Sequence, residues 1–263
     1  MSDQMCAGMF CWFECASTEA VKAKPFYAGL FDWNAEDLPM PGDPSGSYTM
    51  FRVGDADMAG LYQMSGPQFE GVPSHWITYV QVDSADDTAE RAAALGGKLV
   101  MPLMDVPGVG RIGFVQDPTA AIIGIFQPGE RRGCGQPASS HGAMGWSELA
   151  TNDTAKARTF YCELFGWGAK EEADGSYTEF QVGGRSIGGL TTLPEEQKSM
   201  PPNWMPYVAV DDCDACSAKV AELGGKTLVP PTHIPGVGSF SVFMDPAGAC
   251  LSFIQLDEPS KEC

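Results

Sequence analysis

The sequence predicts an α+β protein made of four modules, each with one strand, one helix and three further strands (βαβββ). Two observations predict this fold. Residues 75–127, aligned without gaps to residues 203–255, share 20 of 53 positions, and such internal similarity indicates a repeated architecture. Each of the two copies then divides again into two halves with the same order of strand-like and helix-like patterns. The chain is therefore expected to contain two domains, at 8–128 and 142–257, joined by a linker at 129–141.

The first module is expected to begin with a strand at Met9–Cys15. A helix should follow from Ser17 or Thr18 to Phe31, because short hydroxyl side chains cap the free N–H groups of a first turn. Pro25 predicts a kink or a later start of this helix. Gly/Pro-rich stretches separate the next strand-like runs, at Tyr48–Val53 and Met58–Met64.

The second module restarts the pattern with a strand at Trp76–Val82. Asp83 or Ser84 is expected to cap the next helix, and Gly96-Gly97 to end it by supplying a left-handed conformation. Turn signals then separate three strands, at Lys98–Met101, Arg111–Gln116 and Ile122–Gln127. The second copy repeats the same order.

Composition limits the classes of function. The formal net charge of −18 argues against nucleic acid and anionic membranes as partners, because both require clustered Lys and Arg. Two explanations of this charge remain open: solubility through self-repulsion, or an acidic cleft that attracts a cationic ligand. No apolar run approaches the ~18 residues of a membrane span, and residues 1–4 do not resemble a signal peptide. A cytoplasmic location is therefore expected.

The nine cysteines are interpreted mainly as small hydrophobic residues. Cys213 and Cys216 form a Cys-x-x-Cys pair at the expected start of a helix, but no second pair completes a zinc set. Cys11 and Cys15 should lie on the strand face opposite the Trp-x-Glu motif described next.

The ordered motifs resemble a known superfamily. Trp-x-Glu at Trp12 and again at Trp146 precedes Phe-Tyr-x-x-Leu-Phe-x-Trp at Phe26 and Phe160, and Leu-Gly-Gly-Lys, Pro-Gly-Val-Gly and Asp-Pro follow in both copies. This set resembles the vicinal oxygen chelate superfamily of glyoxalase I, bleomycin-resistance proteins and extradiol dioxygenases. More narrowly, the chain is similar to tandem lactoylglutathione-lyase-related proteins, or hydroxylases of the 27 kDa antigen type. The resemblance implies two vicinal oxygen chelate domains, each with two modules around a cleft.

Metal-dependent members of that superfamily place His, Gln or Glu ligands on the first strand of each module and near the end of the last strand. The matching positions in this chain carry side chains that do not suit a divalent cation, apart from one serine hydroxyl. They are Trp12, Ile77, Gly124, Trp146, Met205 and Ser252. No metal ion and no other cofactor is therefore expected.

The same positions are expected to line a small-molecule site. Because side chains alternate along a strand, Glu14 should share a face with Trp12, and Glu148 with Trp146. By the same argument Tyr79 shares a face with Ile77, and Tyr207 with Met205. Gly124 and Ser252 complete the predicted ligand-binding set. The loops Asp37–Ser47 and Pro194–Pro202 are expected to close over the clefts.

Two functions remain open at this point. The first is a metal-independent protein that binds or sequesters a small planar or cationic molecule. The second is a metal-independent lyase or isomerase acting on a small carbonyl or enol compound, with Glu14 or Glu148 as general base. A structural alternative for each Glu is that it anchors a Tyr hydroxyl or a backbone N–H across the sheet. Either a monomer or a homodimer is expected.

Overall fold

The structure is a computed structural model that describes residues 6–40, 43–129 and 140–257. The chain divides into two compact units, and each combines stretches of both repeats. Unit 1 comprises Met1–Cys11, Ile77–Gly133 and Trp146–Met205, and unit 2 comprises Trp12–Trp76, Cys134–Gly145 and Pro206–Cys263. Each unit thus holds most of one module from each repeat. The domain bounds 8–128 and 142–257, which follow the repeats, stay a prediction.

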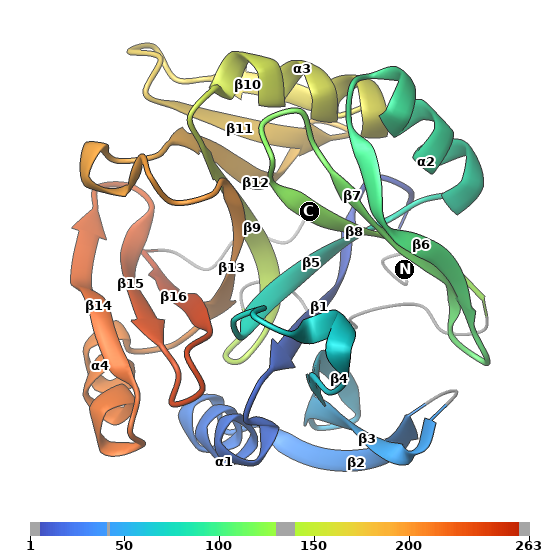
Figure 1. Cartoon of the computed structure of the whole chain (residues 1–263). Coiled ribbons are helices and arrows are strands. Elements are labelled where there is room, and N and C mark those ends of the chain that lie inside the picture. The colour runs from blue at the N-terminus through green and yellow to red at the C-terminus, as the bar shows by residue number, and fades with distance from the viewer. Residues whose placement is uncertain (1–5, 41–42, 130–139, 258–263) are drawn as a thin grey trace. The chain divides into compact units, whose positions relative to one another are not determined.

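The first module lies almost entirely in unit 2, and Figure 1 labels its helix and strands. It consists of β1 (Phe10–Ser17), α1 (Ala20–Phe31), β2 (Asn34–Met40), β3 (Asp43–Val53) and β4 (Ala56–Gln63), followed by the short 3-10 helix η1 (Pro67–Phe69). Its strands form the part β2-β3-β4-β1 of an eight-stranded sheet that holds every strand of the first repeat. Strand β1 runs parallel to β4, and the other two pairs are antiparallel. The expected loop at Asp37–Ser47 was wrong, because most of this stretch pairs as the β2–β3 hairpin.

The start of α1 also differs from the prediction. The helix begins at Ala20, and its N-cap Glu19 makes no side-chain cap hydrogen bond. Ser17 instead ends β1, and its hydroxyl accepts a hydrogen bond from the Glu19 backbone N–H over 3.1 Å. Pro25 lies inside the helix, which continues to Phe31.

The second module of unit 2 comes from the end of the chain. It consists of β13 (Asn203–Ala209), α4 (Cys213–Glu222), β14 (Lys226–Ile234), β15 (Gly238–Met244) and β16 (Cys250–Leu256). Its strands form the part β13-β16-β15-β14 of a second eight-stranded sheet, which holds every strand of the second repeat. Cys213 and Cys216 are buried in the first two turns of α4, where burial raises their pKa values to about 11 and about 12. Neutral buried thiols agree with the interpretation of these cysteines as hydrophobic residues.

Unit 1 contains the other two modules apart from their first residues, 75–76 and 144–145, which belong to unit 2. One consists of β5 (His75–Gln81), α2 (Ala85–Ala94), β6 (Lys98–Val106), β7 (Gly110–Gln116) and β8 (Ile122–Pro128), in the order β5-β8-β7-β6. The other consists of β9 (Met144–Thr151), α3 (Thr154–Phe165), β10 (Gly168–Glu171), β11 (Tyr177–Val182) and β12 (Arg185–Thr192), in the order β10-β11-β12-β9, followed by η2 (Glu195–Gln197). Ser84 caps α2 by accepting the Asp87 N–H, and Gly96 follows the helix with φ +86°, as predicted.

A buried Trp–Tyr–Asp arrangement joins the two modules of each unit. In unit 2, Trp76 Nε1 on β5 donates to the Tyr27 hydroxyl on α1 over 2.8 Å, and this hydroxyl faces Asp245, which follows β15. Asp245 Oδ1 accepts the backbone N–H groups of its own turn, whereas Oδ2 has no hydrogen-bond partner within normal distance among the described residues. Tyr27 and Asp245 come from different repeats, so this contact stabilises the pairing of their modules.

Unit 1 repeats the arrangement with equivalent residues. Trp204 Nε1 donates to the Tyr161 hydroxyl over 2.9 Å, and Tyr161 faces Asp117. The residues just before the first strand of each repeat add a reciprocal contact. Trp167 Nε1 donates to Gly8 O in unit 1 over 2.7 Å, and in unit 2 the equivalent Trp33 Nε1 donates to Gly142 O over 2.8 Å. Together these contacts explain why each compact unit crosses the boundary between the repeats.

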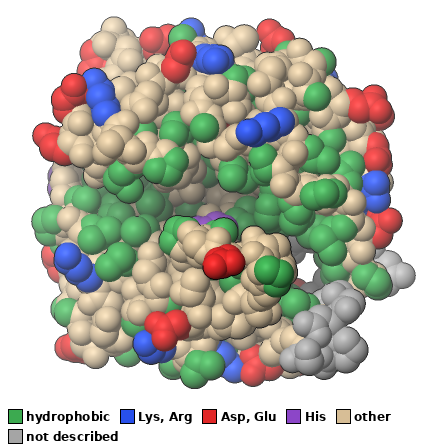
Figure 2. Space-filling view, viewed as in Figure 1, with side chains coloured by type: hydrophobic (Ala, Val, Ile, Leu, Met, Phe, Trp, Pro, Cys, Tyr) green, Lys and Arg blue, Asp and Glu red, His purple; other side chains and the backbone are tan. Residues whose placement is uncertain are grey.

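The described surface carries mixed charge. Figure 2 shows red acidic side chains spread over the surface that faces the viewer, among fewer blue Lys and Arg. Within the described residues, no helix is both long and apolar enough to span a membrane.

Candidate functional site

The Trp-x-Glu motif of the first repeat lies on a half-buried face of unit 2. Along β1, Phe13 and Cys15 are buried whereas Trp12 and Glu14 are half-buried, so the predicted alternation is present. On β3, Phe51 packs against the Tyr27 ring of α1, with 6.2 Å between ring centroids. Phe51 therefore points to the sheet face that α1 covers. Because neighbouring side chains on a strand point to opposite faces, Glu14 points to the other face, which α1 does not cover.

Tyr48 connects the two residues of the motif. Its hydroxyl donates to Glu14 Oε2 over 2.7 Å and accepts from Trp12 Nε1 over 2.9 Å. The ring reaches Glu14 because Gly60 on β4 lies between the two strands, in register with Glu14 and with Met50. A Cβ atom on Gly60 would lie 1.7 Å from the Tyr48 hydroxyl. Gly60 is thus required to leave space for the tyrosine.

The environment of Glu14 is aromatic. Tyr62 on β4 pairs directly with Tyr48 on β3. Burial, and after it the negative charge of Glu14, raises the pKa of the Tyr62 hydroxyl far above its usual value. Tyr62 therefore stays neutral and can act as a hydrogen-bond donor beside the carboxylate.

The second repeat carries the equivalent Trp, Glu, Tyr and Gly in unit 1, with the same Tyr–Glu contact. Trp146 and Glu148 are half-buried on β9. The Tyr177 hydroxyl on β11 donates to Glu148 Oε2 over 2.8 Å. Gly189 is in register with Glu148, and a Cβ atom there would lie 1.8 Å from the Tyr177 hydroxyl. The structural alternative for both glutamates, that each anchors a Tyr hydroxyl across the sheet, is therefore present in the structure.

Sequence reasoning missed the two tyrosines and the two glycines. A signal was available in the repeat, because Ser-Tyr-Thr around Tyr48 returns around Tyr177, and Gly60-Leu61 returns as Gly189-Leu190. What the repeat did not show is the strand register that places each Tyr hydroxyl over its glycine.

The remaining predicted residues are mostly closed to solvent. In unit 1, Ile77 and Tyr79 are 5% and 2% exposed, and the Tyr79 ring covers Gly124, its partner on β8. Met205 is half-buried. A ligand role for these residues stays a prediction.

In unit 2, Tyr207 on β13 is in register with Ser252 on β16. Ser252 is fully buried, and its hydroxyl has no hydrogen-bond partner among the described residues. It stands where Gly124 stands in the first repeat. Its predicted ligand role, like that of Tyr207, is not tested by the structure.

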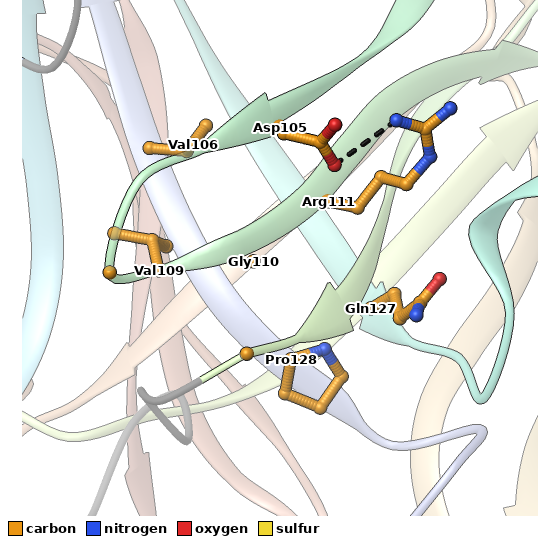
Figure 3. Close-up of a pocket in the computed structure, with 9 residues that line it drawn as sticks. Asp105, Val106, Val109, Gly110, Arg111, Gln127 and Pro128 are labelled. Atoms are coloured by element: carbon orange, nitrogen blue, oxygen red, sulfur yellow. Dashed lines mark hydrogen bonds and ion pairs between the residues drawn. The ribbon is translucent and has the colours of Figure 1, made fainter.

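A separate concavity of about 310 Å³ lies at the β6–β7 turn of unit 1 (Figure 3). Asp105 and Arg111 border it and are paired with each other over 3.1 Å. Arg111 also pairs with Asp86 over 2.9 Å. Much of the remaining lining is the backbone of the turn around Gly108 and Gly110. Because the lining is mostly turn backbone and excludes the Trp-x-Glu residues, the two tyrosine-linked faces are better candidates for function.

Comparison with known proteins supplies the family. A family model described as the Glyoxalase/Bleomycin resistance protein/Dioxygenase superfamily matches residues 13–123 and again 143–253. The chain belongs to this superfamily. Both matches begin at a Trp-x-Glu strand and include the tyrosine and glycine that complete each face.

Relatives within the superfamily extend over nearly the whole chain. The protein named "Putative glyoxylase CFP32" from Mycobacterium tuberculosis is 34% identical over 247 residues, which cover 93% of each chain. The "Anthracycline biosynthesis protein DnrV" from Streptomyces peucetius is 30% identical over 260 residues, covering 94% of this chain and 93% of the relative.

Solved structures of the superfamily share the fold. The Mn(II)-bound glyoxalase from Novosphingobium aromaticivorans has a TM-score of 0.65 at 14% identity, covering 95% of this chain and 82% of that one. The 2,3-dioxygenase LapB from Pseudomonas sp. KL28 also has a TM-score of 0.65, at 11% identity, covering 98% of this chain and 96% of that one. At these identities the likeness establishes the fold alone.

The superfamily includes metal-bound members, and the side chains at the corresponding positions of this chain decide whether a metal ion fits. The six positions matching the family's ligands hold Trp, Ile, Gly, Trp, Met and Ser. Among the described residues, no group of three or more His, Cys, Asp or Glu side chains could hold an ion. The donor set therefore does not fit a divalent cation, which requires several oxygen or nitrogen ligands.

Proposed function

We propose that the chain binds a small planar or cationic organic molecule at its tyrosine-linked Trp-x-Glu faces, without a metal ion. The observation that carries this proposal is the repeated strand with a half-buried Trp and Glu, in which a Tyr hydroxyl donates to the Glu. In the first repeat the same hydroxyl also accepts from the Trp. An aromatic surface beside a carboxylate suits a flat ring with a cationic group, through ring stacking and charge-assisted hydrogen bonds. The net charge of −18 adds a general attraction for cations.

The names of relatives support the same class of ligand. DnrV is named for anthracycline biosynthesis, and anthracyclines contain a planar fused-ring system. An anthracycline with an amino sugar combines the flat ring and the cation that the proposal requires. It is also fluorescent, and therefore serves as a direct probe of binding.

Titration of chelator-treated protein with such an anthracycline tests the proposal. We expect saturable binding that is unchanged by added Mn²⁺, Ni²⁺ or Zn²⁺. Glu14→Gln and Glu148→Gln should each weaken binding at one face by about tenfold, the equivalent of ~1.4 kcal/mol, because a hydrogen bond to a charged group contributes ~1.5–3 kcal/mol. Glu163→Gln, at an exposed position of α3, is the matched control. Absence of saturable binding, or binding that requires a metal ion, would contradict the proposal.

A second candidate is a metal-independent enzyme that removes a proton next to a carbonyl. It is favoured by the direct contact between a carboxylate, which can accept a proton, and a Tyr hydroxyl, which can donate to an oxyanion. The hydroxyl also stabilises the charged carboxylate, however, and so makes it a weaker base. Exchange of the α-protons of small ketones in D₂O, followed by NMR, separates the two functions. An enzyme should lose this exchange in the Glu14→Gln/Glu148→Gln variant, whereas a binding protein should not accelerate it at all.

A further inference from the structure

The two faces share a frame but differ in the side chains around it. The aromatic face, in unit 2, consists of Trp12, Glu14, Tyr48, Met50 and Tyr62. The polar face, in unit 1, consists of Trp146, Glu148, Tyr177, Glu179 and Thr191. Strand register shows which residues correspond between them, and two of the five positions differ in chemistry.

The first difference lies in the row that contains the central glycine. On the aromatic face, Gly60 is in register with Glu14 on one side and with Met50 on the other, and Met50 is 3% exposed. On the polar face, Gly189 is in register with Glu148 and with Glu179. Glu179 thus stands where the other face has a buried methionine. The polar face carries two carboxylates, two strand spacings or about 10 Å apart at Cα.

Glu179 is held in its charged form. The Ser186 hydroxyl donates to its carboxylate, and Lys170 Nζ lies 3.1 Å from Oε1. The hydroxyl, and after it the lysine, lowers the pKa of Glu179. Both carboxylate oxygens already accept a hydrogen bond, but each has a further lone pair. The side chain is 25% exposed, so this capacity can be used by a ligand.

The second difference lies in the neighbouring row. Tyr62 pairs with Tyr48 on β3 and with Ala16 on β1. The equivalent Thr191 pairs with Tyr177 and Ala150. Both Tyr62 and Thr191 are half-buried. A phenol ring on one face is therefore replaced by a small hydroxyl on the other.

We propose that the two faces recognise different chemistry: the aromatic face takes a planar ring system, and the polar face takes a polyhydroxylated amine. Residues 50 and 62, and the equivalent residues 179 and 191, determine this difference. The proposal rests on the proposed function, because it assigns ligand classes to the same two faces.

The physical reason is the match of polar groups. An amino sugar presents several O–H and N–H donors, and each donor that loses water without a new acceptor weakens binding. The polar face offers the carboxylates of Glu148 and Glu179 and the Thr191 hydroxyl as acceptors. The aromatic face offers Glu14 beside three rings, which favours flat apolar ligands through stacking.

Two probes separate these chemistries: 1,4-dihydroxyanthraquinone, which is planar and uncharged, and D-glucosamine, which is a polyhydroxylated amine. Binding of both to the full chain is measured by calorimetry and by saturation-transfer NMR. We expect wild type to bind one equivalent of each. Glu179→Met/Thr191→Tyr should weaken glucosamine binding at least tenfold and create a second anthraquinone site.

The reverse change replaces the aromatic residue at position 62, which is half-buried, so that the protein still folds. A thermal melt checks the fold of the variant. Tyr62→Thr should weaken anthraquinone binding about tenfold and leave glucosamine binding within twofold. Glu163→Gln is again the control for loss of one negative charge.

The outcomes distinguish this inference from the proposed function. If both probes bind at sites that require Glu14 and Glu148, but the exchanges at 62, 179 and 191 leave both affinities within twofold, the assignment of ligand classes is wrong and the proposed function stands. If wild type binds neither these probes nor the anthracycline, both are wrong.

Discussion

The buried Trp–Tyr–Asp arrangement is expected to determine how strongly the two modules of each unit hold together. Tyr27 is fully buried, Trp76 is 7% exposed and Asp245 is 2% exposed. Tyr27→Phe removes the acceptor of the Trp76 Nε1 donor, at 2.8 Å, and the hydroxyl that faces Asp245. A buried polar group left without its partner costs about 1–3 kcal/mol, so two affected groups give a loss of about 2–6 kcal/mol in the free energy of unfolding. This is a large part of the ~5–15 kcal/mol of an ordinary domain.

Urea unfolding followed by tryptophan fluorescence measures this loss, and hydrogen exchange locates it. Tyr27→Phe should raise exchange mainly in unit 2, whereas the equivalent Tyr161→Phe should do so mainly in unit 1. Tyr62→Phe, at a half-buried position, is the control and should change the stability by less than about 0.5 kcal/mol. The reasoning is refuted if both buried variants unfold within about 0.5 kcal/mol of wild type.

Three further predictions concern single sites. Burial raises the pKa of Asp245 in the folded state. The shift therefore stabilises the folded protein fully at pH values below the usual pKa of about 3.9, where the carboxyl is protonated. This stabilisation is lost as the pH rises through the folded pKa. Asp245→Asn should therefore become more stable relative to wild type between pH 4 and neutral pH, as thermal melts in a pH series can check. Gly189→Ala should displace the Tyr177 hydroxyl, lower the stability by about 1–3 kcal/mol and weaken binding at the polar face, whereas normal binding with normal stability would contradict the packing argument. Cys213, buried and with a pKa raised to about 11, should react with Ellman's reagent far more slowly than the exposed Cys6, and equal rates would show that the first turn of α4 opens in solution.

Much of the local architecture could be predicted from residue patterns. The repeat, the βαβββ order and the alternation that places Trp12 and Glu14 on one face depend on neighbouring residues and on the two-residue period of a strand. The cap at Ser84 and the turn at Gly96 are likewise local chemistry. The β2–β3 hairpin was missed because its Pro and Gly residues resemble a loop when strand pairing is not known.

The candidate site was predicted only in part, for the same reason. The motif placed Glu14 on a face, but Tyr48, thirty-four positions away, reaches it only because β4 lies between their strands with Gly60 at the crossing point. Strand order and register are properties of the whole sheet, and a shift of one residue would move these side chains to the other face.

The sequence by itself determined the modules, their repetition, and the residue types on each strand face, because these depend on contacts within short stretches of chain. Only the tertiary structure decided which modules share a compact unit. The contacts responsible, such as Tyr27 with Asp245 and Tyr161 with Asp117, join residues from different repeats. The strands of each repeat form one sheet, whereas these contacts join modules of different repeats. Both repeats carry nearly the same set of interacting residues, so local patterns do not show which modules make such contacts, and the packing of the whole chain decides this.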